Sequence, residues 1–253
     1  MKLIFMKKFI FVLCLILPVL ANCINNYSNN NQMKTITVQK VTMPQAVPTI
    51  SQVREVLEAE NIEFNPIDEV NWKTYPYKPD VKFRIVHSIN EIYIQYVVRE
   101  EGSRATFGQD AGSRPYTDSC VEFFMIPSSK DSVYYNLEMN CIGYGTFACG
   151  ADRKARTRFG DEILSQIRRE SSLGAEPFGD RNGIVEWTLT IAIPKSLYSY
   201  MADIEDFSKR TVRANFYKCG DDMKVPHFLS WNKVGCEKPN FHTPEYFGNV
   251  YFE

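Results

Sequence analysis

Short runs of alternating apolar and polar residues, rich in Val, Ile, Phe and Tyr, recur along the chain after residue 34. This period-two pattern is typical of β-strands that bury one face. The sequence predicts strands at residues 36–41, 83–87, 91–98, 121–126, 134–141, 185–193, 212–217 and 249–252. Segments rich in Gly, Asn, Asp and Ser separate them and predict turns, among them 88–90, 127–131, 179–183 and 220–222.

Helical signals are few. Residues 51–60 carry apolar side chains at helical spacing and predict a short helix capped by Ser51, and residues 195–200 predict a single turn. Many strands with almost no helix indicate an all-β fold of two packed antiparallel sheets, a β-sandwich of the jelly-roll or immunoglobulin-like type. We expect one domain over residues 34–253, with an elaborated loop at 99–117.

The first 22 residues have the pattern of a signal peptide. Lys2, Lys7 and Lys8 precede an uncharged run at 9–20 and a small residue at Ala21. The run is shorter than the about 20 residues that a membrane-spanning helix needs, so we expect the segment to be removed on export.

Two routes of export fit this segment. Residues 20–23, Leu-Ala-Asn-Cys, resemble a bacterial lipobox, which predicts lipid attachment at Cys23 and an outer-membrane protein facing the periplasm or the cell surface. Cleavage after Ala21 would release the protein instead. The Asn-rich segment 23–33 is then a polar tether in front of the domain, and a lipid would be its only contact with the membrane.

Charge and cysteine content narrow the function further. Without the three signal-peptide lysines the chain has 26 basic and 30 acidic residues, which argues against a nucleic-acid partner and suits neutral sugars better than acidic ones. No pair of cysteines has the C-x-x-C spacing of a zinc or redox site. We therefore expect buried free thiols and no metal at the five cysteines of the domain, with disulfide pairing left open: Cys120, Cys141, Cys149, Cys219 and Cys236.

Candidate chemistry lies in scattered polar residues, because no nucleophile elbow, H-E-x-x-H helix or phosphate-binding glycine loop occurs. Glu122 and Glu138 lie on strands expected to be neighbours, where they could act as the acid and base of a glycosidase or accept hydrogen bonds from sugar hydroxyls. A basic run is interpreted as a solvated loop rather than a site for an anionic polymer: Arg153, Lys154, Arg156 and Arg158.

Aromatic residues point to a binding role. Tyr116 and Phe241 lie in segments too rich in Pro, Thr and Asn to be strands, and an exposed ring can stack on the apolar face of a sugar. Ordinary packing is the alternative for each ring. Trp187 and Trp231 lie in strand-like segments and are interpreted as core residues.

Several segments together resemble carbohydrate-binding module family 9, in particular its stand-alone members from Bacteroidetes. The resemblance covers residues 65–253. Its pieces are Ile67-Asp68 before Trp72, the hairpin 84–99, D-S-C-V-E-F-F at 118–124, Y-Y-N-L-E-M-N at 134–140, V-E-W at 185–187 leading to Ile193-Pro194, L-S-W-N at 229–232 and F-G-N-V at 247–250.

The resemblance implies a β-sandwich that binds sugar without cutting it. In characterised members two tryptophans hold a sugar end, and their positions are taken here by Tyr116 and Phe241. The family's sugar-binding glutamate matches Glu122 and its strand asparagine matches Asn140, whereas Glu138 stands where the family has an arginine. That departure reverses a charge, so a glucose or cellobiose preference is not carried over. Family members bind structural calcium, but the chain has no dense Asp/Asn loop to hold it, and no cofactor is assigned.

Three functions remain open from the sequence. The first is an exported or lipid-anchored protein that holds an oligosaccharide or polysaccharide chain end between Tyr116 and Phe241, oriented by Glu122, Glu138 and Asn140, in support of separately encoded glycoside hydrolases. The second is a glycoside hydrolase that uses Glu122 and Glu138. The third is an envelope protein-interaction module in which the two rings are simply buried.

Overall fold

The computed structural model describes residues 33–128, 133–199 and 207–253. The predicted signal peptide, Cys23 and the tether up to residue 32 lie outside these ranges. Among the helices that they contain, none is long and apolar enough to cross a membrane.

Strands dominate the described chain. They are β1 (Thr35–Lys40), β2 (Asn65–Pro66), β3 (Glu69–Val70), β4 (Asp80–His87), β5 (Glu91–Ala105), β6 (Cys120–Ile126), β7 (Tyr134–Asn140), β8 (Gly145–Gly150), β9 (Arg156–Arg158), β10 (Arg168–Ser171), β11 (Phe178–Pro194), β12 (Arg210–Gly220), β13 (His227–Ser230) and β14 (Gly248–Phe252). The helices are α1 (Ile50–Ala59) and α2 (Asp161–Leu164), and single 3-10 turns are η1 (Pro115–Thr117), η2 (Lys195–Ser199) and η3 (Pro244–Tyr246). Each predicted strand is present, which confirms the all-β prediction.

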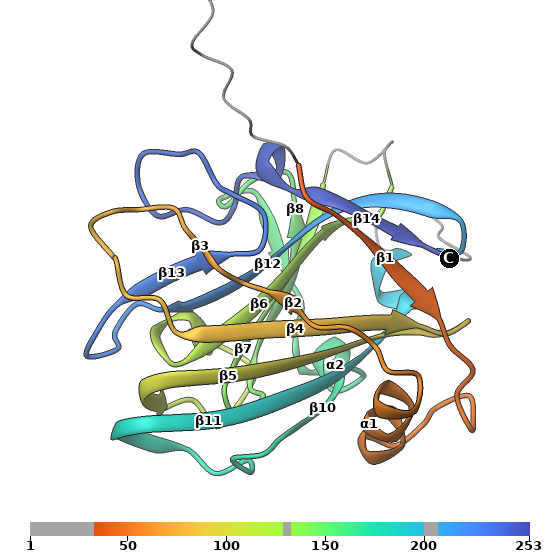
Figure 1. Ribbon diagram of the computed structural model, residues 1–253, viewed down its shortest axis with the longest axis horizontal. Coiled ribbons are helices and arrows are strands. Elements are labelled where there is room, and N and C mark those ends of the chain that lie inside the picture. Colours follow the sequence, from red (N-terminus) through yellow and green to blue (C-terminus); the bar gives the residue numbers. More distant parts are fainter. Residues whose placement is uncertain (1–32, 129–132, 200–206) are drawn as a thin grey trace, which may run out of the picture. The chain divides into compact units, whose positions relative to one another are not determined.

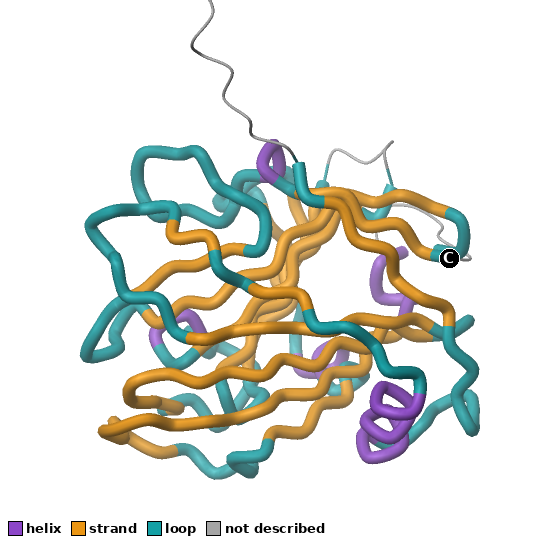
Figure 2. Tube along the Cα trace, viewed as in Figure 1, coloured by secondary structure: helices purple, strands orange, loops and turns teal. Residues whose placement is uncertain are grey.

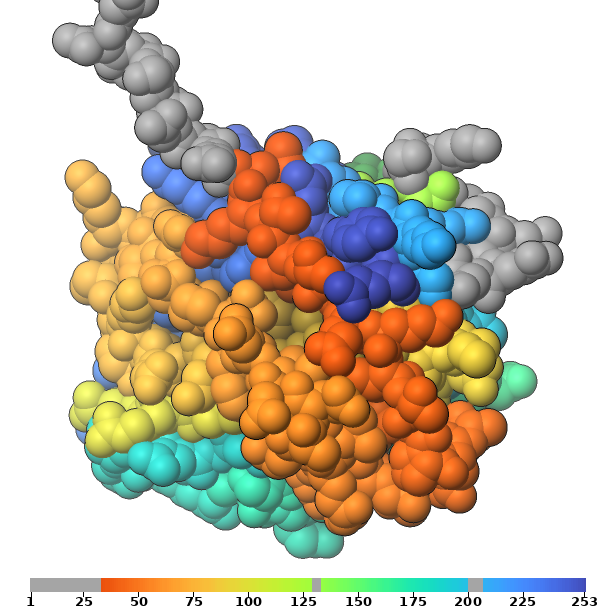
Figure 3. All heavy atoms as spheres, turned by 45° about the vertical axis from the view of Figure 1, so that its right-hand side comes forward, coloured from red at the N-terminus to blue at the C-terminus, as the bar shows by residue number. Residues whose placement is uncertain are grey.

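The strands pack as a β-sandwich of two layers (Figures 1 and 2). One layer has the order β10-β11-β5-β4, and the other has the order β14-β12-β6-β7-β8-β9. Strand β1 joins them, because its first part runs parallel to β14 and its last two residues run parallel to β4. Figure 3 shows β1 lying against β14 on the surface. The sandwich is thus confirmed, but its sheets are mixed rather than purely antiparallel.

Aromatic side chains fill the space between the layers. Phe83 of β4 stacks on Phe216 of β12 with ring centroids 3.7 Å apart, and Phe216 stacks in turn on Phe123 of β6 at 4.8 Å. Trp187 and Trp231 are only 1% and 2% exposed, which confirms that both belong to the core. Such rings bury large apolar areas and contribute strongly to the stability of the sandwich.

One cluster of charged and polar side chains lies inside this core, and we call it the Lys218 cluster. Lys218 of β12 forms an ion pair at 2.8 Å with Glu100 of β5, and neither side chain is exposed. Lys218 also donates to Nε2 of His227 at 2.7 Å, and the indole of Trp187 donates to Glu100 at 2.7 Å. Burial, followed by the charge of Lys218, holds the pKa of His227 well below its usual value, so this imidazole stays neutral.

Helix α1 is confirmed, but its cap differs from the prediction. The side chain of Thr49, not of Ser51, accepts a hydrogen bond from the backbone N–H of Gln52 at 3.2 Å, and Gln52 Oε1 accepts from the backbone N–H of Thr49 at 2.9 Å. This capping box needs Glu or Gln three residues after the cap, and only Thr49 has that partner. The helix therefore begins at Ile50.

Two segments predicted as loop or turn are strand instead. Strand β5 continues to Ala105 and strand β11 begins at Phe178, so residues 179–183 pair with the end of β5. Two register shifts absorb the glycine-rich stretch, in which Gly183 has a φ of 83°. The turn-like composition here marks bulges in a long antiparallel pair, not a reversal of the chain. The long loop is correspondingly reduced to residues between Ala105 and Cys120.

Candidate functional site

A pocket of about 380 Å³ opens on the outer face of the layer that contains β6, β7 and β12. Side chains along these strands point alternately to the core and to the outer face, and those on the outer face form the floor of the pocket. Val121 and Phe123 of β6 point into the core between the layers, so Glu122 points to the other face. Glu138 of β7 and Cys219 of β12 reach the floor by the same alternation.

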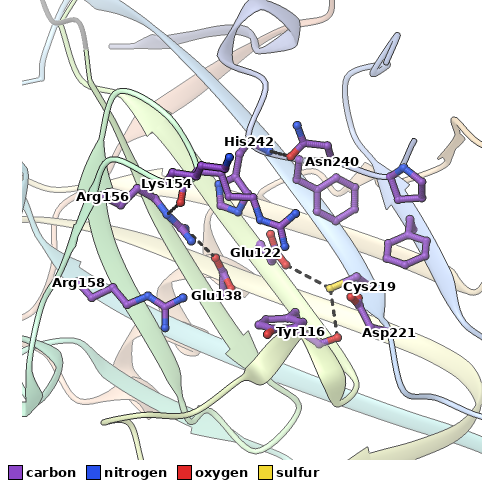
Figure 4. A pocket seen from close by; sticks show the side chains of 14 residues that line it. Tyr116, Glu122, Glu138, Lys154, Arg156, Arg158, Cys219, Asp221, Asn240 and His242 are labelled. Carbon is purple, nitrogen blue, oxygen red and sulfur yellow. Dashed lines mark hydrogen bonds and ion pairs between the residues drawn. The ribbon is translucent and has the colours of Figure 1, made fainter. Parts of the chain in front are cut away.

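The walls come from segments far apart in the sequence. Tyr116 stands on η1 and Phe228 on β13, and further walls come from residues 239–242 and from the segment around β9. Figure 4 shows Glu122 between Glu138 and Cys219, with Arg156 and Arg158 on the side of Glu138. The pocket therefore has an acidic floor and a partly basic rim.

The two predicted carboxylates are direct neighbours, because Glu122 and Glu138 face each other in the register of β6 and β7. Glu138 accepts hydrogen bonds from Asn136 at 2.8 Å and from Arg156 at 3.5 Å. Burial raises the pKa of both carboxyls, and the charge of Glu138 raises that of Glu122 further. The pair thus favours holding a proton, which gives the floor both a hydrogen-bond donor and acceptors.

Tyr116 and Phe241 both line the pocket, but they differ in accessibility. Tyr116 is half-buried. Phe241 is only 7% exposed and stacks on Tyr217 with ring centroids 4.1 Å apart. Of the two alternatives left open for each ring, Phe241 is closer to ordinary packing, because Tyr217 covers one face of its ring.

The basic run is not simply a solvated loop. Arg153, Lys154, Arg156 and Arg158 all line the pocket, and Arg156 forms an ion pair with Glu138 at 3.5 Å. The other three side chains belong to exposed residues. The net charge of the chain is therefore a poor guide to the charge around this pocket.

Asn140 lies elsewhere. It is fully buried and is not among the pocket-lining residues. Its amide donates to Phe107 O at 2.9 Å and to Asp118 Oδ2 at 3.1 Å, and its oxygen accepts from the backbone N–H of Tyr144 at 3.0 Å. The structure brings together Tyr116, Glu122, Glu138 and Phe241 at the pocket. Asn140 instead forms hydrogen bonds with the segment between β5 and β6, which carries Tyr116.

Sequence reasoning did not single out Cys219, Asp221 or His242 as pocket residues. Burial, with the nearby charge of Asp222, raises the pKa of Asp221 to about 6. The alternation of β12 was a usable signal for Cys219, since it lies two residues after Tyr217 on the same face. No local sequence pattern indicates that Asp221 or His242 lines the pocket.

His242 should make the stability of the protein depend on pH. Burial, then the charges of Arg156, Arg153 and Arg158, lower its pKa to about 3. The unfolded chain takes up this proton near pH 6.5 and the folded protein does not, so stability from this group is present above pH 6.5 and is lost as the pH falls towards 3. We expect urea unfolding to show a contribution of up to about 1.4 kcal/mol per pH unit over that range.

A variant isolates this contribution. His242 Nδ1 contacts the hydroxyl of Tyr134 at 2.9 Å, and asparagine can supply an acceptor there without titrating. The stability difference between wild type and His242→Asn should narrow, or change sign, between pH 7 and pH 4. An equal difference at both pH values would contradict the assignment.

Comparisons with known proteins identify the family and agree with the fold. The model of the family described as carbohydrate-binding family 9 matches residues 51–252. A candidate carbohydrate-binding protein from Bacteroides uniformis is 43% identical, with a TM-score of 0.83 over 87% of this chain and 100% of its own. A family 9 carbohydrate-binding module from Caldicellulosiruptor kristjanssonii, solved in complex with cellotriose, is 14% identical, with a TM-score of 0.53 over 87% of this chain and 94% of its own. A search of curated proteins finds no match.

Proposed function

Because the chain belongs to carbohydrate-binding family 9, we propose that the pocket of Tyr116, Glu122 and Glu138 binds a saccharide without cleaving it. One observation carries this proposal. A half-buried aromatic ring and a pair of neighbouring carboxylates line the same open pocket. A ring offers stacking to the C–H face of a sugar, while carboxyl and guanidinium groups satisfy its hydroxyls.

The carboxyl groups and the aromatic rings of the pocket have different roles in binding the saccharide. Glu122 and Glu138 exchange hydrogen bonds with hydroxyl groups, and Arg156 fixes Glu138 from the rim. Tyr116 supplies the accessible ring. Phe241 forms a wall behind the sugar rather than the second half of a symmetrical clamp, because it is already stacked on Tyr217.

We further propose that the protein works in the cell envelope. The support is the signal-like segment 1–22, and Cys23 in a lipobox-like setting. A lipid at Cys23 and the polar segment 23–33 would hold the domain at the outer membrane within reach of polysaccharide. In this position it supplies chain ends to separately encoded glycoside hydrolases.

Replacing Tyr116 by alanine should weaken saccharide binding by up to about tenfold, because an aromatic ring contact contributes roughly 0.5–1.5 kcal/mol. Isothermal titration with gluco-, xylo- and manno-oligosaccharides and with oligogalacturonides would first identify the ligand. Tyr251→Ala is the matched control, since Tyr251 is an exposed tyrosine of β14 outside the pocket. Unchanged affinity in Tyr116→Ala would refute the stacking role.

Phe241 needs a milder change. Truncation to alanine would leave a cavity against Tyr217 and destabilise the fold, so Phe241→Leu is the informative variant. We expect a smaller loss of affinity than for Tyr116→Ala.

The same panel tests for catalysis. We expect no released product. Product that disappears in Glu122→Gln would show instead that Glu122 and Glu138 act as a glycosidase pair. If no saccharide binds at all, a role in contacting another envelope protein becomes the better hypothesis.

A further inference from the structure

Two cysteines that are distant in sequence meet beside Glu122. Cys120 of β6 and Cys219 of β12 are direct partners in the antiparallel register of these strands. Cys219 Sγ lies 3.2 Å and Cys120 Sγ lies 4.0 Å from Glu122 Oε1. The three potential ligand atoms all lie within 4.8 Å of one another.

We propose that Cys120, Cys219 and Glu122 form a binding site for a thiophilic divalent cation, with Zn²⁺ as the best fit. In a tetrahedral site with Zn–S near 2.3 Å and Zn–O of 2.0–2.2 Å, neighbouring ligand atoms are roughly 3.5–3.8 Å apart. The two observed sulfur–oxygen distances, 3.2 and 4.0 Å, bracket this spacing. The two sulfur atoms lie within 4.8 Å of each other, so side-chain adjustments of about 1 Å would bring the three ligand atoms to this spacing.

The donor set selects the kind of metal. Two sulfur ligands suit zinc and exclude calcium, which binds oxygen. This site is therefore different in kind from the structural calcium sites of other family members. All three side chains are buried, so the protein would enclose the ion on every side except the one that faces the pocket.

The acidic side chains of the floor favour a cation, although the basic rim of the same pocket opposes it. The two thiols are the hydrogen-bonding partners of Glu122 Oε1, and the carboxyls of Glu138 and Asp221 act on Glu122 from either side. A dication would relieve the repulsion among these acids. Binding displaces the thiol protons, and any proton on Glu122, to solvent, so the affinity rises with pH.

The fourth coordination position faces the pocket. Cys219 and Glu122 both line the pocket, whereas Cys120 lies behind them and is not among the lining residues. Three protein ligands and one open position are the arrangement in which zinc accepts an exogenous donor. Water, or a hydroxyl of a bound molecule, would complete the coordination.

The test uses the reduced, full chain. After treatment with a chelator, titration with Co²⁺ should produce one equivalent of thiolate-to-cobalt absorption in the near ultraviolet, and Zn²⁺ should displace the cobalt. Cys120→Ser and Cys219→Ser should each abolish the band and weaken Zn²⁺ binding by more than about 100-fold, beyond the loss that removal of an outer partner produces. Cys149→Ser is the control, because Cys149 is a buried free thiol of β8 outside this cluster.

Two results would overturn the proposal. One is the absence of a thiolate band in the folded wild type, or a band that survives both serine variants. The other is a Cys120–Cys219 disulfide in the exported protein, found by mass spectrometry, because it would consume both thiols. The inference does not rest on saccharide binding, and Tyr116→Ala should leave the cobalt spectrum unchanged.

Discussion

Replacement of Lys218 by methionine is expected to lower the free energy of unfolding by about 3–5 kcal/mol, as is typical when one partner of a buried ion pair is removed. The variant keeps the length of the side chain but leaves the carboxylate of Glu100 in the core without its cation. It also removes the donor to His227 Nε2. Urea or guanidinium unfolding, monitored by tryptophan fluorescence, measures the loss.

Two further variants show that the buried charge is responsible. Adding Glu100→Gln to Lys218→Met should recover part of the stability, because a neutral amide can still accept from Trp187 and costs less to bury. Arg99 precedes Glu100 on β5, and Arg99→Ala removes its ion pair with Glu186 of β11, in which the side chains are 54% and 72% exposed. That change should cost no more than about 1 kcal/mol. Equal losses for Lys218→Met and Arg99→Ala would contradict the prediction.

The Lys218 cluster also explains where the strand predictions stopped too early. Alternation predicted a strand at 91–98 and another at 212–217, and each ended just before charged residues. In the structure β5 runs on through Glu100 and β12 runs on through Lys218, because these two charges neutralise each other between the layers. In a pattern of hydrophobic and polar residues, each charged residue predicts that the strand has left the core. Only the paired strands show that the two charges belong together.

The contacts in the floor of the pocket could be predicted from the sequence in part, whereas those in its walls could not. Glu122 and Glu138 could be placed side by side because β6 and β7 are consecutive and their side chains alternate. The contact of Cys219 with Glu122 joins residues 97 positions apart, and no local pattern encodes it. The same holds for the rim, where the residues around β9 fold back over the floor.

For Asn140, the family resemblance predicts the position on the strand but not the partners of the side chain. The residue lies on β7 as expected, on the same face as Glu138. Its amide donates hydrogen bonds to Asp118 and to the backbone of the loop between β5 and β6, so it holds this loop and does not line the pocket. Because Asp118 accepts one of these hydrogen bonds, its replacement tests how the loop is held.

Replacement of Asp118 by alanine is expected to cost about 3–5 kcal/mol of stability and to weaken saccharide binding. The buried carboxylate accepts hydrogen bonds from Thr106 N and Thr106 Oγ1, each at 2.8 Å, and from Asn140 at 3.1 Å. Its removal leaves several buried donors unsatisfied, each at a cost of roughly 1–3 kcal/mol. Because Tyr116 lies just before Asp118, the stacking ring should lose its fixed position even in molecules that remain folded.

Asp180→Ala is the matched control for this prediction. Asp180 accepts from the same arginine that approaches Asp118, namely Arg104, at 3.3 Å, but its side chain is 64% exposed. Its loss should change stability by less than about 1 kcal/mol and leave binding intact. Calorimetric titration well below the unfolding temperature of Asp118→Ala separates the two effects. Full affinity in the folded fraction would mean that Tyr116 is held by its own packing, and that the buried carboxylate stabilises the loop without shaping the pocket.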